Sequence, residues 1–354
     1  MSAATPSDAN ATPETRALHS RLRELTGIRT LFGHQDDLAY GGIERHVRRL
    51  PGVVGFDLGG IEALAGHNLD GVPFQSMIRW VREAHAKGAL VTLSWHSVNP
   101  ITNGGYGHNT APMSIASVLR NGECHEKFLR WLEHVAMFIE QLTDASGRPI
   151  PVIFRPFHEH SGDWFWWGIG AKPDQQPQNS PEEFVALWRF TVDYLRDVAG
   201  LHNLLYAISP DRSRLRLDAL EDDYLRGYPG DEFVDILGID NYWDAGRADD
   251  DRTSDELFDG YVATLEAVAR VGEARDKLVA QTETGTPGER VGHADDPWTG
   301  FLARAAEHSA LTRKHLWHLV WRDEVEAPDD LARLVGHPLI AFAGDVDDIY
   351  GAHQ

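Results

Sequence analysis

The residues best suited to chemistry lie in the segment 152–168, where His158 and Glu159 follow a short apolar run. Residues 152–156 read as a buried strand, because apolar and β-branched side chains dominate the run and proline bounds it. A carboxylate at the carboxyl end of such a strand loses hydration, which raises its pKa and lets it act as an acid. The segment also supplies indole rings, whose faces suit the apolar C–H faces of sugars: Trp164, Trp166 and Trp167.

A second carboxylate, Glu283, follows another apolar run at residues 277–281 and precedes a glycine turn. Two carboxylates beside aromatic walls are the arrangement that hydrolyses glycosidic bonds. When the two carboxyl groups lie ~5–5.5 Å apart, an attacking water does not fit between them, and one group must act as the nucleophile. A single glutamate is more often a surface or salt-bridged residue, but the buried strand before each of these two favours a catalytic pair.

Eight short apolar runs recur along the chain, separated by amphipathic or loop segments. The runs are residues 30–33, 53–57, 90–95, 152–156, 204–209, 234–240, 277–281 and 315–321. The clearest helical stretches between them are residues 74–87, 123–143, 181–199, 254–271 and 298–308. A strand followed by a helix, eight times over, predicts an α/β fold, a single (β/α)8 TIM barrel. The carboxyl ends of barrel strands converge on one face, so we expect the polar and aromatic residues at these ends to meet there.

The expected domain organisation is a disordered lead-in over residues 1–13 and one (β/α)8 catalytic domain over residues 14–354. The lead-in is rich in Ala, Ser, Thr and Pro and has no large apolar residue beyond Met1. It lacks the basic start and the apolar stretch of a signal peptide. Two locations therefore stay open: the cytoplasm if this start is native, and the exterior if a signal has been removed.

The composition argues against several classes of protein. The net charge of −21 disfavours nucleic acid or an anionic membrane as a partner. No run of 18 apolar residues is present, and the single Cys124 excludes an internal disulfide and any zinc site with paired cysteines. The 18 histidines lack the spacing of a zinc helix, and no glycine-rich phosphate loop occurs. We therefore expect no metal, no cofactor and a monomeric protein.

Over nearly the whole chain, the sequence resembles glycoside hydrolase family 26. The resemblance rests on Arg-Pro-Phe-His-Glu at residues 155–159, on Gly-Asp-Trp-Phe-Trp-Trp-Gly at residues 162–168, and on Thr-Glu-Thr-Gly at residues 282–285. Further matching segments are residues 31–35, 94–100 and 240–242. The family belongs to the retaining barrel glycosidases, so the resemblance implies that Glu159 is the general acid/base and Glu283 the nucleophile.

The same resemblance implies roles for the residues around this pair. His158 and Tyr242 match residues that position the nucleophile and the sugar at the cleavage point, and Trp164 matches an aromatic residue beside that point. The residues implied to bind sugars on the non-reducing side are His96, Trp321 and Arg322. Taken by residue type alone, His96 could instead be a core histidine and Trp321 ordinary barrel packing. The loops Asn99–Met113 and Gly170–Ser180 are expected to border the cleft, although the first could equally be a plain surface loop.

The activity that the resemblance implies is hydrolysis of internal β-1,4-mannosidic bonds in mannan, galactomannan or manno-oligosaccharides. Alternatives within the family are an exo-acting mannobiohydrolase, a mixed-linkage β-glucanase and a β-1,3-xylanase. A non-enzymatic carbohydrate-binding barrel is disfavoured, because such proteins usually lose one of the two carboxylates and both are present here.

Overall fold

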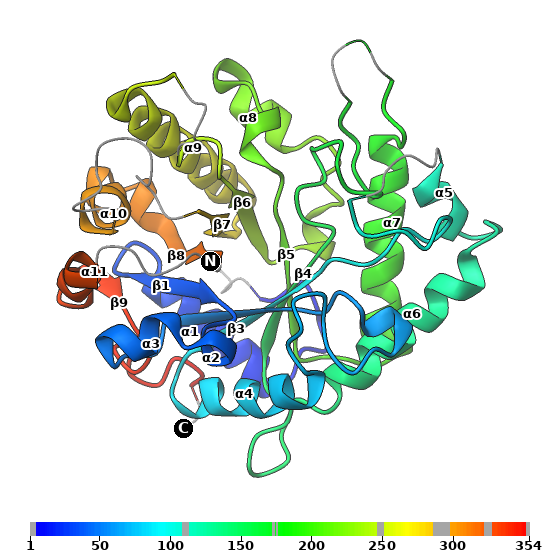
Figure 1. Ribbon diagram of the computed structural model, residues 1–354, viewed down its shortest axis with the longest axis horizontal. Coiled ribbons are helices and arrows are strands. Elements are labelled where there is room, and N and C mark those ends of the chain that lie inside the picture. The colour runs from blue at the N-terminus through cyan, green and yellow to red at the C-terminus, as the bar shows by residue number, and fades with distance from the viewer. Residues whose placement is uncertain are drawn as a thin grey trace.

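Eight parallel strands close into a barrel at the centre of the molecule (Figure 1). The computed structural model describes residues 5–107, 113–171, 174, 176–245, 251–285, 298–321 and 328–351. The barrel strands are β1 (Thr30–Gln35), β2 (Val53–Asp57), β3 (Leu90–Trp95), β4 (Val152–Pro156), β5 (Leu204–Ile208), β6 (Ile236–Asp240), β7 (Leu278–Thr284) and β8 (His315–Val320). Consecutive strands pair in parallel, and β8 returns to β1 with Trp317 opposite Leu31, which closes the barrel. The predicted (β/α)8 fold is confirmed.

Helices surround the barrel and connect its strands. They are α1 (Pro13–Leu25), α2 (Asp37–Tyr40), α3 (Gly42–Val47), α4 (Phe74–Ala86), α5 (Ser114–Val118), α6 (His125–Ile139), α7 (Pro181–Asp193), α8 (Leu220–Tyr224), α9 (Ser254–Arg275), α10 (Arg304–His308) and α11 (Pro328–Val335). π-helical turns extend α7 at Tyr194–Val198 and precede α10 at Trp298–Ala303. Among the described residues, no helix combines the length and the apolar character needed to cross a membrane.

Two of the longer helices, α7 and α9, begin where the sequence supplies capping groups. Ser180 accepts a hydrogen bond from the Glu183 backbone N–H at the start of α7, and the Glu183 side chain accepts one from the Ser180 N–H. Thr253 and Glu256 form the same reciprocal pair at the start of α9. Each pair satisfies backbone donors that the first helical turn leaves free, which fixes where the helix starts after its loop.

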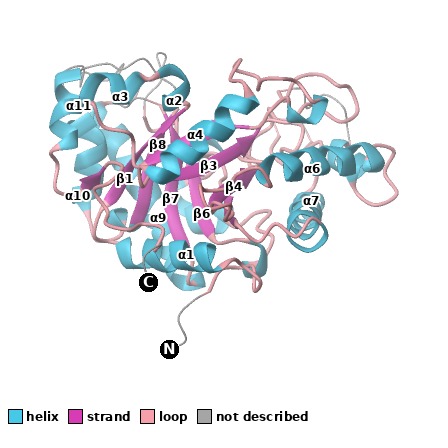
Figure 2. Ribbon diagram, turned by 90° about the horizontal axis from the view of Figure 1, so that it is seen from below, coloured by secondary structure: helices cyan, strands magenta, loops and turns pink. Residues whose placement is uncertain are grey.

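Two apolar clusters make up the core. The larger cluster lies between the strands and the surrounding helices, and the smaller one fills the barrel near the amino ends of the strands. Leu18, Leu22 and Leu25 of α1 pack into the smaller cluster, and Figure 2 shows α1 lying beneath the strands. Because α1 closes this end, the opposite end of the barrel is left to form a site.

The segment before α1 differs from the disordered lead-in that the sequence suggests. The Ser7 backbone N–H donates to Asp235 Oδ1 over 2.6 Å, and Asp8 Oδ2 lies 2.8 Å from Nδ1 of His202. Ala11 is buried against the barrel. Residues 5–13 therefore have a defined conformation, held by polar contacts to residues about 200 positions away, which local composition does not reveal; residues 1–4 lie outside the described range.

Candidate active site

The turn after β4 places Glu159 through an unusual backbone path. Phe157 and Glu159 both have left-handed φ angles, 51° and 53°, which are costly for residues other than glycine. Phe157 is fully buried, and its ring packs against Trp166 and Trp167. The Glu159 backbone N–H donates to the Ser209 carbonyl over 2.7 Å, which ties the turn to the end of β5. The aromatic segment after Glu159 thus holds a strained turn that aims this carboxylate over the barrel.

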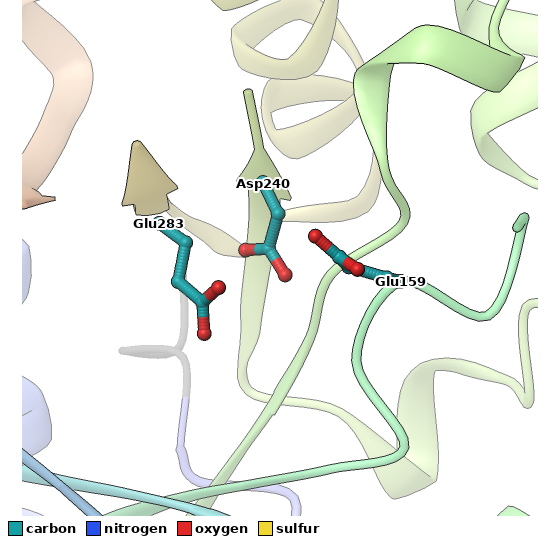
Figure 3. A group of neighbouring side chains, drawn as sticks. All are labelled: Glu159, Asp240 and Glu283. Atoms are coloured by element: carbon teal, nitrogen blue, oxygen red, sulfur yellow. The ribbon is translucent and has the colours of Figure 1, made fainter. Parts of the chain in front are cut away.

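Three carboxylates meet above the barrel axis. Glu159 reaches in from the turn after β4, Asp240 from the end of β6 and Glu283 from β7 (Figure 3). Each residue contributes one carboxylate oxygen to a group of three atoms that all lie within 4.8 Å of one another. All three residues are buried. Strand β7 extends to residue 284, so Glu283 lies within the strand and not just after its predicted end at residue 281.

Arg155 balances the charge beneath these carboxylates. It is buried in β4, its Nη1 donates to Asp240 Oδ2 over 2.8 Å, and its Nη2 donates to Glu283 Oε1. The Tyr242 hydroxyl donates to the other oxygen of Glu283 over 3.2 Å. A cation and a hydroxyl donor on the same carboxylate fix its orientation, as a nucleophile requires.

Glu159 lies in a different environment. Burial raises the pKa of this carboxyl well above its ordinary value, and the charges of Asp211, Asp240 and Glu283 add to the increase. One contact opposes the increase, because Trp164 Nε1–H donates to Glu159 Oε2 over 2.6 Å and favours the ionised form. Glu159 is therefore suited to hold a proton and donate it, while the Arg155 and Tyr242 donors fix the orientation of Glu283. Two such carboxylates side by side provide an acid and a nucleophile.

A pocket of about 210 Å³ opens beside the two glutamates. Its walls come from the segments after β2, β3, β4, β6 and β8 and from the end of β7: Leu69, Asp70, His96, Tyr106, His158, Glu159, Phe165, Tyr242, Glu283 and Trp321. The structure therefore brings together four of the residues expected to bind sugar, namely His96, His158, Tyr242 and Trp321. Trp164 joins them through its hydrogen bond to Glu159. Arg322 lies outside the described residues.

The positions of His96 and Trp321 bear on whether these residues contact the substrate or only pack within the barrel. Both side chains line the pocket, and their rings are 5.7 Å apart. Trp321 also packs against the smaller apolar cluster, so it borders both the pocket and the barrel core. Tyr106 of the loop Asn99–Met113 also lines the pocket, so this loop borders the cleft as expected, although its residues 108–112 lie outside the described range. No described residue of Gly170–Ser180 lines the pocket. Asn179 of that loop instead donates to the carbonyls of Trp166 and Gly168 and supports the aromatic segment.

Several residues of the site carry no assigned role from the sequence. Arg155 and Asp240 appear only within motifs, and Asp57, Leu69 and Asp70 are not assigned to the site at all. An arginine inside an otherwise apolar strand is itself a signal, because a buried cation needs buried carboxylate partners. Asp57 and Asp240 each end a predicted strand, and that position alone marks them as candidates for the active face.

The three carboxylates are also the group in the described part of the chain that could hold a metal ion. The contacts of these three carboxylates in the structure favour a role without a metal ion. The Arg155 guanidinium already bridges Asp240 and Glu283, and the raised pKa of Glu159 favours its protonated form, which is a poor ligand. The expectation that the protein needs no metal stays a prediction.

A closed parallel barrel with two facing glutamates below aromatic walls, at the carboxyl ends of its strands, defines the class of barrel glycosidases. Residues 7–301 match glycosyl hydrolase family 26, and the chain belongs to this family. A mannan endo-1,4-beta-mannosidase of Bifidobacterium adolescentis is 36% identical over 298 residues, which are 80% of this chain and 28% of that protein. The chain thus spans well under half the length of this curated relative.

Solved structures of the same family resemble the whole chain. A GH26 beta-mannanase from Bacteroides ovatus has a TM-score of 0.83 and 34% identity, and the match covers 96% of this chain and 97% of that one. A modular endo-beta-1,4-mannanase from Cellulomonas fimi has a TM-score of 0.82 and 29% identity, and here the match covers 98% of this chain and 79% of that one. The family expected from the sequence motifs is therefore confirmed.

Proposed function

We propose that the protein hydrolyses internal β-1,4-mannosidic bonds with net retention of the anomeric configuration. The observation that carries this proposal is the spacing of the two glutamates. One oxygen of Glu159 lies within 4.8 Å of one oxygen of Glu283, near the ~5–5.5 Å separation of retaining enzymes and short of the ~6.5–9.5 Å that an inverting enzyme needs for its water. The names of the relatives from Bifidobacterium adolescentis and Bacteroides ovatus support mannan as the substrate.

The residues divide the reaction into two steps. Glu283, held by Arg155 and Tyr242, attacks the anomeric carbon while Glu159 donates its proton to the leaving glycosidic oxygen. A covalent glycosyl-enzyme forms and the first product leaves. Glu159, now ionised and held by Trp164, takes a proton from water, which attacks the same carbon and releases Glu283. The two inversions give net retention.

The Glu283→Ala variant tests this assignment. Turnover of manno-oligosaccharides should nearly disappear, and azide should restore part of it by occupying the vacated space and giving an α-linked mannosyl azide. NMR of the native reaction should show β-configured product first. An inverted first product would refute the retaining mechanism, and a Glu283→Ala variant with normal turnover would refute the choice of nucleophile.

An exo-acting mannobiohydrolase is a second candidate, because the loop after β2 lines the pocket. Leu69 and Asp70 reach the same pocket as His96, and the Tyr40 hydroxyl holds this loop by donating to the Asp70 carbonyl over 2.7 Å. A loop fixed at one end of a small pocket would favour chain ends over internal bonds. Mannobiose as the sole early product, with no fall in mannan viscosity, would favour this candidate over endo action.

The sugar preference needs its own experiment. A panel of mannan, galactomannan, mixed-linkage glucan and xylan, with products separated by chromatography, distinguishes the mannanase from the glucanase and xylanase alternatives. We further propose that the protein acts as a monomer, which size-exclusion chromatography with light scattering tests directly. A dimer with full activity would contradict only this last point.

A further inference from the structure

Asp57 is a buried carboxylate that the proposed reaction does not use. It ends β2 and is 1% exposed. Its Oδ1 accepts the Gly59 backbone N–H over 2.7 Å, and its Oδ2 accepts the Ser94 hydroxyl over 2.7 Å. The same Oδ2 lies 2.7 Å from Nδ1 of His96, which lines the pocket. Asp57 therefore touches a pocket residue without facing the pocket itself.

The contact continues through a second histidine. Nε2 of His96 lies 2.9 Å from Nε2 of His158, and the ring planes are inclined by 77°. His158 is directly followed by Glu159, so a line of contacts joins Asp57 to the residue next to the catalytic acid. A hydrogen bond between two ring nitrogens needs one shared hydrogen, so the protonation of the two rings is linked.

Counting hydrogens limits the possible arrangements. An ionised carboxylate only accepts hydrogen bonds, so His96 must donate its Nδ1–H to Asp57. The other ring nitrogen of His96 then either accepts a hydrogen from His158 or, if His96 is an imidazolium, donates one to it. Nδ1 of His158 has no hydrogen-bond partner among the described residues, so His158 has no carboxylate to support a charge of its own.

The surrounding charges favour a proton on His96 over one on His158. Burial alone would lower the pKa of His96, but the charges of Asp57 and Glu283 raise it above its ordinary value against the opposing effect of Arg155. Burial lowers the pKa of His158 well below its ordinary value, and the charges of His96 and Arg155 lower it further. Titratable or charged groups face His96 from β2, from β4 and its following turn, from β7 and from three loops: Asp57, Asp70, Tyr106, Arg155, His158, Glu159, Tyr242 and Glu283.

We propose that Asp57 is a positioning residue for sugar binding, which holds His96 as an imidazolium with Nδ1–H on Asp57 and Nε2–H on His158. The pair of rings then forms a fixed wall of the pocket. The paired charges also offset each other, because the buried Asp57 carboxylate faces an imidazolium and is not left as an isolated charge. The kinetic part of this inference rests on the proposed hydrolase function, but the protonation state does not.

The first experiment uses the native protein and needs no turnover. Two-bond proton–nitrogen NMR on protein labelled with ¹⁵N-histidine reports which ring nitrogens carry hydrogen, and the His96→Gln variant assigns the signals. At pH 7, His96 should carry hydrogen on both nitrogens and His158 on Nδ1 alone. A neutral His96 in the native protein would overturn the proposal, whatever the protein hydrolyses.

The second experiment is Asp57→Asn, compared with the matched control Asp235→Asn. Both aspartates are buried and accept backbone N–H groups, but Asp235 lies at the opposite end of the barrel beside Ser7. In Asp57→Asn, His96 should lose its second ring hydrogen at pH 7. The KM for manno-oligosaccharides should rise about tenfold, the loss expected for one displaced hydrogen-bonded group. The kcat should fall less than about threefold, because the contacts of the two catalytic glutamates remain.

The control separates positioning from stability. Asp235→Asn should lower the melting temperature while KM stays within about twofold of the native value. An equal rise of KM in both variants, or an unchanged KM in Asp57→Asn, would overturn the positioning role.

If the Asp57 variant does not fold, Ser94→Ala replaces it, because this substitution removes one of the hydrogen bonds that orient the Asp57 carboxylate. A smaller rise in KM is expected there, and an unchanged KM would again count against the role. If the native protein hydrolyses none of the glycans in the substrate panel, the proposed function is refuted. The NMR experiment still tests the protonation state of His96, because it does not depend on turnover.

Discussion

Replacing Trp164 by phenylalanine should move the pH dependence of the reaction in a direction that the structure fixes. The indole Nε1–H donates to Glu159 Oε2 over 2.6 Å, and it is the contact that lowers the pKa of this carboxyl against the effect of burial. Phenylalanine keeps an aromatic wall but lacks the donor. Removing a bond to the ionised form raises the pKa of Glu159, so the acid stays protonated to higher pH.

The size of the shift follows from the strength of the bond. A hydrogen bond to a charged group contributes about 1.5–3 kcal/mol when buried, and one pKa unit corresponds to about 1.4 kcal/mol. Trp164 is only partly buried, so the lower end of this range applies. The alkaline limb of kcat/KM should therefore move up by about one pH unit. The kcat should also fall, since the ionised Glu159 of the second step is held less firmly.

The assay is a pH profile of kcat/KM on a soluble manno-oligosaccharide, from pH 4 to pH 10. Trp80→Phe is the matched control, because Trp80 lies on α4, stacks on Phe56 at 6.4 Å and belongs to no wall of the pocket. Its profile should coincide with that of the native protein. An alkaline limb that stays in place or moves to lower pH in Trp164→Phe would refute the reasoning that this bond favours the ionised acid.

Three further outcomes are expected. Tyr242→Phe removes the hydroxyl that lies 3.2 Å from Glu283 Oε2 and should lower kcat about tenfold in steady-state kinetics, with an unchanged melting temperature. Glu159→Gln should raise the melting temperature at pH 7 by roughly 2 °C in calorimetry. The folded-state pKa of Glu159 lies above its unfolded value, so its ionisation costs stability as the pH rises through that interval, and the gain should vanish below about pH 4. Ser7→Ala loses the hydroxyl bond to Asp235 Oδ2 and should lower the melting temperature by about 2 °C without changing kcat/KM.

The strands and the two catalytic candidates could be predicted from sequence because their signals are local. An apolar run followed by a carboxylate marks both Glu159 and Glu283, and eight such runs suffice for the barrel. The short helices α2 and α3 after β1 were not predicted, since four to six residues carry too little periodicity to be recognised. Strand β9 (Ile340–Ala341) is shorter still and depends on pairing with β1.

The residues that support the proposed catalytic pair could not be predicted, because their roles depend on contacts between distant strands. Arg155 acquires its role only when β6 and β7 bring Asp240 and Glu283 to it, 85 and 128 residues further along the chain. Asp57 acquires its role only when β3 places His96 beside it. Sequence shows which residue ends each strand, but the tilt and register of the closed barrel decide which of these ends meet.

The pairing of β1 also constrains how the chain folds during synthesis. One edge of β1 pairs with β2, which follows within about twenty residues and places Gly33 opposite Val53. The other edge pairs with β8, near the end of the barrel sequence, where Trp317 lies opposite Leu31. Until the ribosome has released β8, β1 has an open edge that could pair with another chain. We therefore expect folding to finish late and slowly, as contacts of such long sequence separation imply. Chaperone binding to nascent chains that end before residue 315 should be stronger than to chains that include β8.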